Sequence, residues 1–222
     1  MSIINDLKIY YIYYKMSEKV NINNRYPEDG EIRKDMTPYF EYYKCLKHVF
    51  NFNAVKSVCD VGCATGHLLY YLKENDNLQI KGYEYFDYHK KSNLCKVKDY
   101  IEIYDIRDPL NDNVKQYDIV NCSEVGEHID KSFADILIEN AKKLSKKYVI
   151  FTWSSHGGDL EPHCDPLHQH LNPLSREKYI NLMESHGLRA NMELTNKFLM
   201  ESRKYRNFYF WWRESFIIWE KE

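Results

Sequence analysis

The sequence has no excess of charge of either sign and no long hydrophobic run. Its 31 basic and 33 acidic side chains give a formal net charge of −2. Proteins that bind a nucleic-acid backbone usually carry a clustered excess of Lys and Arg, so no nucleic-acid partner is expected. The apolar stretch at residues 9–14 is far shorter than the roughly 20 residues that cross a membrane, so no membrane span is expected either.

The sequence also lacks paired cysteine spacings. Its six scattered cysteines are typical of a reduced, intracellular protein, which predicts a cytoplasmic location. No internal repeat or second domain is evident, and 222 residues suit one α/β domain. We expect residues 36–222 to form this domain and residues 1–35 to be a partly flexible extension. The abundance of Asn, Lys, Ile and Tyr is typical of an AT-rich genome, such as that of a large virus or a protist, and the sequence indicates no particular oligomeric state.

A short apolar run that breaks into glycines is the most informative feature of the chain. The apolar run at residues 58–61 contains Asp60. Gly62 and Gly66 come after the run, and leucines then resume at helical spacing. The pattern predicts a strand, a tight turn and a helix whose first turn has unpaired N–H groups. Glycines in such a turn let the backbone approach a ligand closely. Because Gly62 and Gly66 lie four apart and no third glycine follows, the pattern is not G-x-G-x-x-G and argues against a dehydrogenase.

Three further predicted strands end in polar residues. Residues 79–84 end in Glu84, residues 101–104 precede Asp105 and Ile106, and residues 117–122 lead into Ser123-Glu124-Val125-Gly126-Glu127-His128-Ile129. A carboxylate at the end of the second strand can accept hydrogen bonds from both hydroxyls of a ribose. One such acid alone is usually a solvated surface carboxylate. Four strand ends in this order favour a shared nucleotide site.

These motifs resemble those of the class I S-adenosylmethionine-dependent methyltransferases, in which an acid on the first strand precedes G-x-x-x-G. The stretch after the fourth strand is similar to the E-V-x-E-H-I pattern of small-molecule methyltransferases. The resemblance implies S-adenosylmethionine as cofactor, with the methionine end at the glycine turn, the ribose at the second strand and the adenine at the third. The cofactor residues that it implies are Asp60, Gly62, Cys63, Gly66, Glu84, Asp105, Ile106 and Glu124.

The rest of the chain predicts an α/β fold. Strands and helical segments alternate from residue 56 to 152, which implies parallel strands joined by crossovers. With the resemblance, this predicts a Rossmann-like, mostly parallel sheet of seven strands, with an antiparallel last strand and helices on both faces. The other predicted elements are a helix capped by Thr37 and ending near Phe50, a helix at 132–145, a strand at 148–153, a helix capped by Ser175 and ending before Gly187, and a hairpin-like pair of strands at 189–194 and 214–219. Helical spacing places the following residues on one apolar face of the first of these helices: Met36, Tyr39, Phe40, Tyr43, Leu46 and Phe50.

A histidine-rich segment follows the fifth predicted strand. Four of the nine histidines lie between residues 156 and 170. They could supply a general base, bind a metal, or form only local hydrogen bonds. The candidate bases are His170, His156 and His128, with His170 ranked first, and no residue is assigned as a metal ligand.

Two motifs resemble a subgroup of bacterial and viral methyltransferases, many of them associated with glycan or sugar modification. They are His170-Leu171-Asn172 and Trp211-Trp212-Arg213-Glu214-Ser215-Phe216, which has Ser215 where the subgroup has Asn. The resemblance implies O-methylation of a sugar, nucleotide sugar or glycan. Aromatic rings at 208–212 could stack on a sugar, although packing in the core is favoured.

Other functions fit the motifs less well. Enzymes that methylate base amino groups usually have a Pro-Pro run after the fourth strand, where this chain has Asn121-Cys122-Ser123-Glu124. Cys122 does not follow a proline, as a cytosine-attacking cysteine generally does, and Glu124 and Glu127 lack the context of an arginine-methylating pair. A non-sugar acceptor and a non-catalytic partner protein that binds S-adenosylmethionine stay open as alternatives. The histidine-rich segment favours an enzyme.

Overall fold

The computed structural model describes residues 36–155 and 170–221. The predicted extension at 1–35 and the candidate base His156 lie outside these residues. Within these two ranges, every helix is too short or too polar to span a lipid bilayer.

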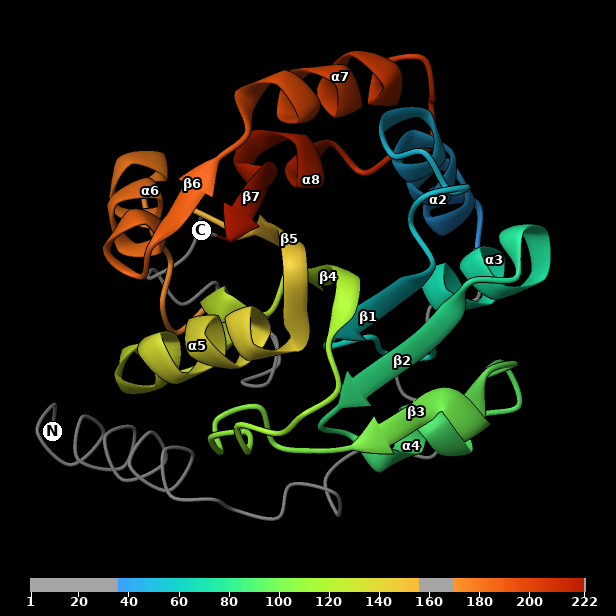
Figure 1. Ribbon diagram of the computed structural model, residues 1–222, viewed down its shortest axis with the longest axis horizontal. Coiled ribbons are helices and arrows are strands. Elements are labelled where there is room, and N and C mark those ends of the chain that lie inside the picture. Colours follow the sequence, from blue (N-terminus) through green and yellow to red (C-terminus); the bar gives the residue numbers. More distant parts are fainter. Residues whose placement is uncertain (1–35, 156–169, 222) are drawn as a thin grey trace, which may run out of the picture. The chain divides into compact units, whose positions relative to one another are not determined.

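Seven strands form one sheet, in the order β3-β2-β1-β4-β5-β7-β6. The first five strands are parallel, and β7 runs antiparallel to both of its neighbours (Figure 1). This arrangement confirms the predicted Rossmann-like, mostly parallel sheet. The strands are β1 (Ser57–Val61), β2 (Gln79–Glu84), β3 (Ile101–Ile103), β4 (Tyr117–Ser123), β5 (Ser145–Thr152), β6 (Leu188–Ala190) and β7 (Ile217–Lys221).

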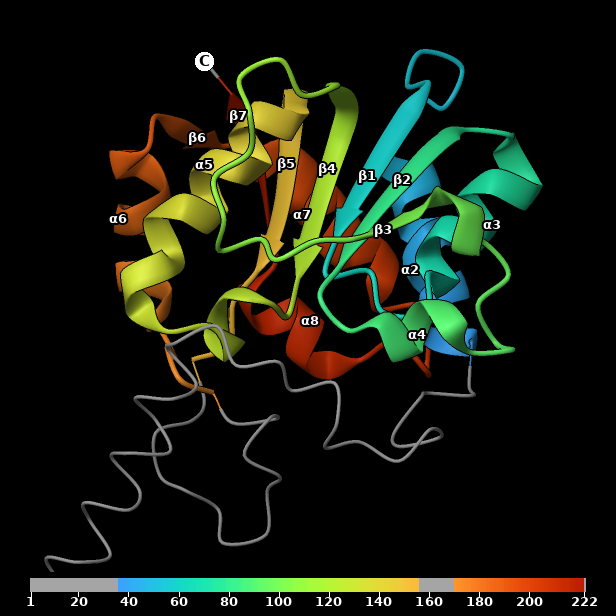
Figure 2. The ribbon, with the colours of Figure 1, turned by 90° about the horizontal axis from the view of Figure 1, so that it is seen from below.

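Helices cover both faces of the sheet (Figure 2). Successive side chains of a strand point to opposite faces, so neighbours such as Val58 and Cys59 belong to different hydrophobic clusters. One cluster includes residues of α2 (Thr37–Val49), α3 (His67–Asp76), α7 (Met192–Ser202) and α8 (Phe210–Ser215), and the other includes residues of α5 (Ala134–Leu144) and α6 (Arg176–Ser185). The other helices among the described residues are α4 (Asp87–Lys91) and the 3₁₀ turns η2 (Lys98–Tyr100), η3 (Gly126–His128) and η4 (Lys131–Phe133).

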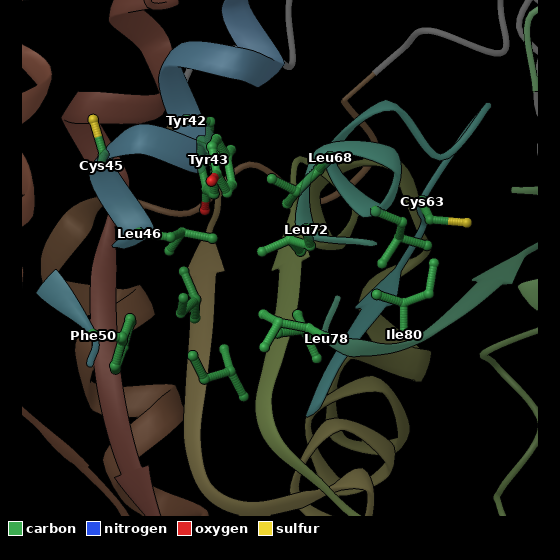
Figure 3. Packing of buried hydrophobic residues seen from close by; sticks show 14 of the residues in the cluster. Tyr42, Tyr43, Cys45, Leu46, Phe50, Cys63, Leu68, Leu72, Leu78 and Ile80 are labelled. Atoms are coloured by element: carbon green, nitrogen blue, oxygen red, sulfur yellow. The ribbon is translucent and has the colours of Figure 1, made fainter. Parts of the chain in front are cut away.

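The first cluster packs α2 and α3 onto the sheet (Figure 3). Leu46 of α2 and Leu72 of α3 are completely buried, and each such side chain contributes about 1.5–3 kcal/mol of transfer free energy. Phe208 and Trp212 are buried in the same cluster, where both rings lie near the ring of Tyr42. These two aromatic residues therefore pack in the core, which is the role that the sequence analysis favoured over stacking on a sugar.

The C-terminal part differs from its prediction. The strand predicted at 189–194 is wrong beyond Ala190, because the Asn191 side chain accepts a hydrogen bond from the Leu194 N–H (2.9 Å) and starts α7. The strand predicted at 214–219 begins only at Ile217, since residues 210–215 form α8. β6 and β7 do form an antiparallel pair at this end of the sheet, as predicted, but α7 and α8 lie between them in the chain, so a long connection joins them instead of a tight hairpin turn.

Two predicted helix caps have different outcomes. The Ser175 side chain accepts a hydrogen bond from the Lys178 N–H at the start of α6, as predicted. Thr37, in contrast, is already the first residue of α2, and Met36 occupies the cap position.

Candidate active site

The carboxyl ends of β1, β2 and β4 meet at one edge of the sheet, where open parallel α/β folds bind their ligands. Asp60 of β1 is paired in register with Gly82 of β2 on one side and with Asn121 of β4 on the other. The local sequence explains this geometry, because strongly apolar runs form the inner strands and polar residues follow where each run ends.

The glycine turn connects β1 to α3 through backbone conformations that favour glycine. Gly62 has φ +71° and Gly66 has φ +74°, in the left-handed region where a side chain is strained. The Gly62 N–H donates to the Tyr83 carbonyl (2.8 Å), which ties the turn to β2. A Cβ on Gly62 would overlap Val125, and one on Gly66 would lie 2.5 Å from Val97. These glycines therefore also permit a close approach between segments of the protein itself.

Cys63 contributes its backbone to the turn, while its side chain lies in the core. Its thiol is buried in the cluster between α3 and the sheet (Figure 3), and a Cβ on Gly82 would lie 2.6 Å from its sulfur. Burial raises the pKa of this thiol well above its ordinary value. The sulfur packs against β2 and the Cys63 N–H donates to the Tyr83 carbonyl (3.2 Å), so the cofactor role of Cys63 stays a prediction.

Glu84 connects the end of β2 to the glycine turn. Its side chain is 6% exposed; Oε2 accepts from the Ala64 N–H (2.7 Å) and Oε1 from the Phe86 N–H (2.9 Å). Burial raises the pKa of Glu84, and these backbone hydrogen bonds oppose the shift. Because a carboxylate has about four acceptor sites, capacity for ribose hydroxyls remains.

Asp60 is buried at the centre of a hydrogen-bond network. It is 5% exposed, and its Oδ1 accepts from Nδ2 of Asn121 (2.7 Å). The Asn121 Oδ1 in turn accepts from the Tyr42 hydroxyl (2.8 Å) and the Ser123 hydroxyl (3.0 Å). Burial raises the pKa of Asp60 to about 7, opposed by Asn121 and reinforced by the charge of Glu84.

Sequence reasoning missed Asn121 and Tyr42 as members of the site. An amide within the apolar run of β4 was the available signal for Asn121, because a buried polar side chain needs a partner. Tyr42 had no such signal, since it lies beside the predicted apolar face of α2.

Asp105 is paired with a residue that the sequence did not single out. Arg107 donates from Nε to Oδ1 and from Nη2 to Oδ2 of Asp105, both at 2.8 Å. The guanidinium carbon lies 5.3 Å from the ring centroid of Tyr85 and 5.6 Å from that of Phe133. Ile106 is mostly buried in the second cluster, and its carbonyl accepts from Nδ2 of Asn140 (2.8 Å). Tyr85 and Arg107 are therefore additional candidates for this end of a cofactor site.

Glu124 turns the chain sharply after β4. It has φ +57°, unusual for a residue with a side chain, and its N–H donates to the Thr152 hydroxyl of β5 (2.9 Å). Gly126 follows against the indole of Trp153, where a Cβ would lie 2.6 Å from the ring. The strained turn aims η3 toward the segment that begins at residue 170.

His128 and His170, two of the predicted bases, lie together. Their ring centroids are 4.9 Å apart. Two hydrogen bonds hold this arrangement: the Asn172 N–H donates to the Glu127 carbonyl (3.0 Å), and the Trp153 indole N–H donates to the Asn172 carbonyl (2.7 Å). The third predicted base, His156, is outside the described residues.

Glu127 completes this cluster, although the sequence indicated no role for it. Its side chain is 0% exposed, and neither carboxylate oxygen has a hydrogen-bond partner in the described part of the chain. Burial and the neighbouring charge of Glu124 raise the pKa of Glu127 well above its ordinary value. One ligand atom from each of Glu127, His128 and His170 lies within 4.8 Å of the others.

A family comparison identifies the type of protein. The family described as "Methyltransferase domain" matches residues 38–192, which is most of the chain and includes every described residue of this site. The chain belongs to this family. It is an S-adenosylmethionine-dependent methyltransferase, so the predicted enzyme class and cofactor are confirmed.

Solved structures share the fold of this methyltransferase. Magnesium protoporphyrin IX methyltransferase from Synechocystis PCC 6803, with bound S-adenosylmethionine, has a TM-score of 0.59 at 13% identity, covering 90% of this chain and 93% of that chain. The N-terminal domain of EvdMO1, in the presence of S-adenosylhomocysteine and D-fucose, has a TM-score of 0.54 at 14% identity. The match covers 98% of this chain and 97% of that chain. The StiE O-methyltransferase region has a TM-score of 0.51 at 18% identity, and the match covers 82% of this chain and 73% of that chain. No curated protein sequence matches this methyltransferase.

Proposed function

We propose that this methyltransferase transfers the methyl group of S-adenosylmethionine to a hydroxyl of a small molecule, namely a sugar, nucleotide sugar or glycan. The observation that carries the proposal is the His128–His170 pair, whose rings lie 4.9 Å apart after the carboxyl end of β4. This is the same edge of the sheet at which the buried acids of β1 and β2 lie. A basic group beside the cofactor edge is what methylation of a hydroxyl requires.

The cofactor roles follow the order of the strands. Asp60 and the glycine turn hold the methionine end, Glu124 lines the same end, and Glu84 accepts from the ribose hydroxyls. Asp105 and Ile106 hold the adenine, with the ring of Tyr85 as a further apolar surface. The burial of Asp60 and Glu84 supports these roles, because a buried carboxylate forms stronger hydrogen bonds to a ligand than an exposed one.

The reaction needs alignment and removal of one proton. The acceptor oxygen attacks the sulfonium methyl in line, a C–O bond forms as the S–C bond breaks, and S-adenosylhomocysteine leaves. The hydroxyl proton passes to an imidazole, for which His170 is the first candidate and His128 the second. Holding oxygen, carbon and sulfur in line supplies much of the rate.

The sugar acceptor rests on two supports. One is the resemblance of His170-Leu171-Asn172 and of residues 211–216 to a subgroup associated with sugar modification. The other is the structural likeness to EvdMO1, which was solved in the presence of D-fucose. The likeness to the magnesium protoporphyrin IX methyltransferase makes a non-sugar acceptor the principal alternative.

Calorimetric titration with S-adenosylmethionine and S-adenosylhomocysteine tests the cofactor site first. Methyl transfer from radiolabelled S-adenosylmethionine is then measured with panels of nucleotide sugars, free glycans, porphyrins and flavonoids. Labelling of a sugar hydroxyl supports the proposal. Labelling of the porphyrin or flavonoid panel alone would replace the acceptor class, and absence of cofactor binding would contradict the cofactor roles.

A further inference from the structure

We infer that Glu127, His128 and His170 form a binding site for a divalent transition-metal ion, with Zn²⁺ as the first candidate. One ligand atom of each side chain lies within 4.8 Å of the other two. Two ligand atoms that are each about 2.0–2.2 Å from one zinc ion lie at most about 4.4 Å apart, so small side-chain rotations would bring these three atoms onto one ion. Two imidazoles and one carboxylate are also a recurrent donor set for metals that keep an open coordination position.

The burial of Glu127 is an independent observation that points to a cation. Its side chain has 0% exposure, and neither carboxylate oxygen forms a hydrogen bond of normal geometry in the described part of the chain, although the backbone N–H groups of Glu127 and Ser154 lie close enough to lower its pKa against the effect of burial. A buried carboxylate without a partner is costly, and buried charges in proteins are normally paired or coordinate a metal. One oxygen of Glu124, Oε1, is likewise buried without a partner. A cation bound by Glu127 would offset the unfavourable charge of both residues.

The backbone around the cluster is held from three sides. Gly126 packs on the Trp153 indole, the Trp153 N–H donates to the Asn172 carbonyl, and the Asn172 N–H donates to the Glu127 carbonyl. These contacts fix η3 against the segment that carries His170. A site whose ligands are positioned before binding loses less conformational entropy when the metal binds.

The exposure of the cluster suits an ion that also receives an external ligand. Glu127 is buried, whereas His128 and His170 are only half-buried. Three protein ligands leave a fourth position of a tetrahedral ion open to water or substrate. With both imidazoles bound to it, a metal in this position would replace the imidazole base: it would lower the pKa of a bound acceptor hydroxyl, whose proton would pass to solvent water. This last role rests on the proposed function, whereas the metal site itself does not.

Metal binding is measured on the full chain without cofactor or acceptor. Protein stripped with EDTA and dialysed is titrated with Zn²⁺ by calorimetry, and with Co²⁺ by the visible absorption that reports ligand type and geometry. We expect one ion per chain at this site. Glu127→Gln and His170→Gln should each weaken its binding at least about tenfold, while His48→Gln on α2 should leave it unchanged.

The variants must be shown to fold. In EDTA, Glu127→Gln should stay folded with a melting temperature close to that of the wild type, since Gln has nearly the size of Glu and burial already disfavours the charge of Glu127. Added Zn²⁺ should raise the melting temperature of the wild type but not that of this variant. The inference is overturned if the wild type binds no ion, or if the Glu127 and His170 variants bind Zn²⁺ as the wild type does. The same samples are also titrated with S-adenosylmethionine. Cofactor binding without metal binding would contradict the metal site alone and leave the proposed function in place.

Discussion

The Asn121 side chain donates a hydrogen bond of 2.7 Å to the Asp60 carboxylate, between positions that are paired in register on β1 and β4. Both side chains are buried, and the Tyr42 hydroxyl extends the network to α2. Asp60 is thereby held in one orientation at the edge where the two central strands end. Its ionisation, unlike that of a surface carboxylate, is coupled to the stability of the fold.

Replacement of Asp60 by Asn should reduce the pH dependence of stability. Burial, opposed by Asn121, raises the pKa of Asp60 to about 7, against about 3.9 in an unfolded chain. The folded state therefore keeps the proton where the unfolded state has lost it, and the free energy of unfolding falls as the pH rises from about 4 to 7. Between pH 5 and 8 the Asp60 contribution to this fall is about 2–3 kcal/mol. Urea unfolding at both pH values measures it.

Asp130→Asn is the matched control for this measurement. The backbone N–H and hydroxyl of Ser132 lower the pKa of Asp130, so its stabilisation is present above the unfolded pKa and is lost only in acid. The free energy of unfolding of this variant should change between pH 5 and 8 by the same amount as that of the wild type. If Asp60→Asn also keeps it, the ionisation of buried Asp60 does not govern this pH range. Burial also raises the pKa of Glu84, so Glu84 contributes to the pH dependence of the free energy of unfolding in both variants.

Glu84→Gln should weaken cofactor binding. The substitution keeps the size of the side chain but removes the charge that is proposed to accept hydrogen bonds from the ribose, and the new amide nitrogen replaces one of the two oxygens that accept from the Ala64 and Phe86 N–H groups. Hydrogen bonds to charged groups contribute about 1.5–3 kcal/mol, so the Kd for S-adenosylmethionine should rise roughly 10- to 100-fold. Glu102→Gln on β3, where Glu102 forms an ion pair with Lys81, should leave the Kd unchanged. Equal affinity of Glu84→Gln and wild type would exclude Glu84 from the ribose site.

Gly62→Ala should destabilise the protein more than Gly187→Ala. Both glycines have a positive φ, +71° and +73°, so alanine is strained at either position, at about 1 kcal/mol. Only at Gly62 would the new methyl group overlap another side chain, that of Val125, whereas nothing lies within 4 Å of the added atom at Gly187. We expect an additional loss of about 1–3 kcal/mol at Gly62, measured by chemical denaturation. Equal losses would show that the turn relaxes around the added methyl group.

His170→Ala should lower turnover while leaving cofactor binding intact. Removing a general base, or a ligand of the metal that replaces it, typically costs about 10²–10⁴-fold in rate. The Kd for S-adenosylmethionine, measured by calorimetry, should stay within about twofold, because His170 is not proposed to contact the cofactor. Loss of binding equal to the loss of turnover would remove His170 from the catalytic role. His48→Ala, a histidine of α2, serves as the control.

The C-terminal elements show where sequence reasoning failed. Residues 189–194 were predicted as a strand, but β6 has only three residues and depends on pairing with β7, which lies far away in the sequence. The Asn191 cap then starts α7. A three-residue strand has too few positions for an alternating pattern to be distinguished, so local propensity could not place its end.

The face of α2 was also predicted only in part. Phe40 was placed on the buried face but is 37% exposed, whereas Tyr42, which was not included, is 2% exposed. Four aromatic residues lie within the five consecutive positions 39–43 of this helix, so hydrophobic periodicity alone does not select one face. Contact with the Asn121 side chain and the rings of Phe208 and Trp212 decides which tyrosine is buried.

The sequence by itself determined the order of strands, acids and glycines, and with it the fold class and the cofactor. These features are local: an apolar run, the acid at its end and a turn that requires glycine are all set within a few residues. Only the tertiary structure decided which side chains meet, since Asp60 finds Asn121 through strand register and Glu127 joins His128 and His170 through packing on Trp153. Such contacts join residues far apart in the chain, and their geometry depends on how whole elements pack rather than on any local pattern.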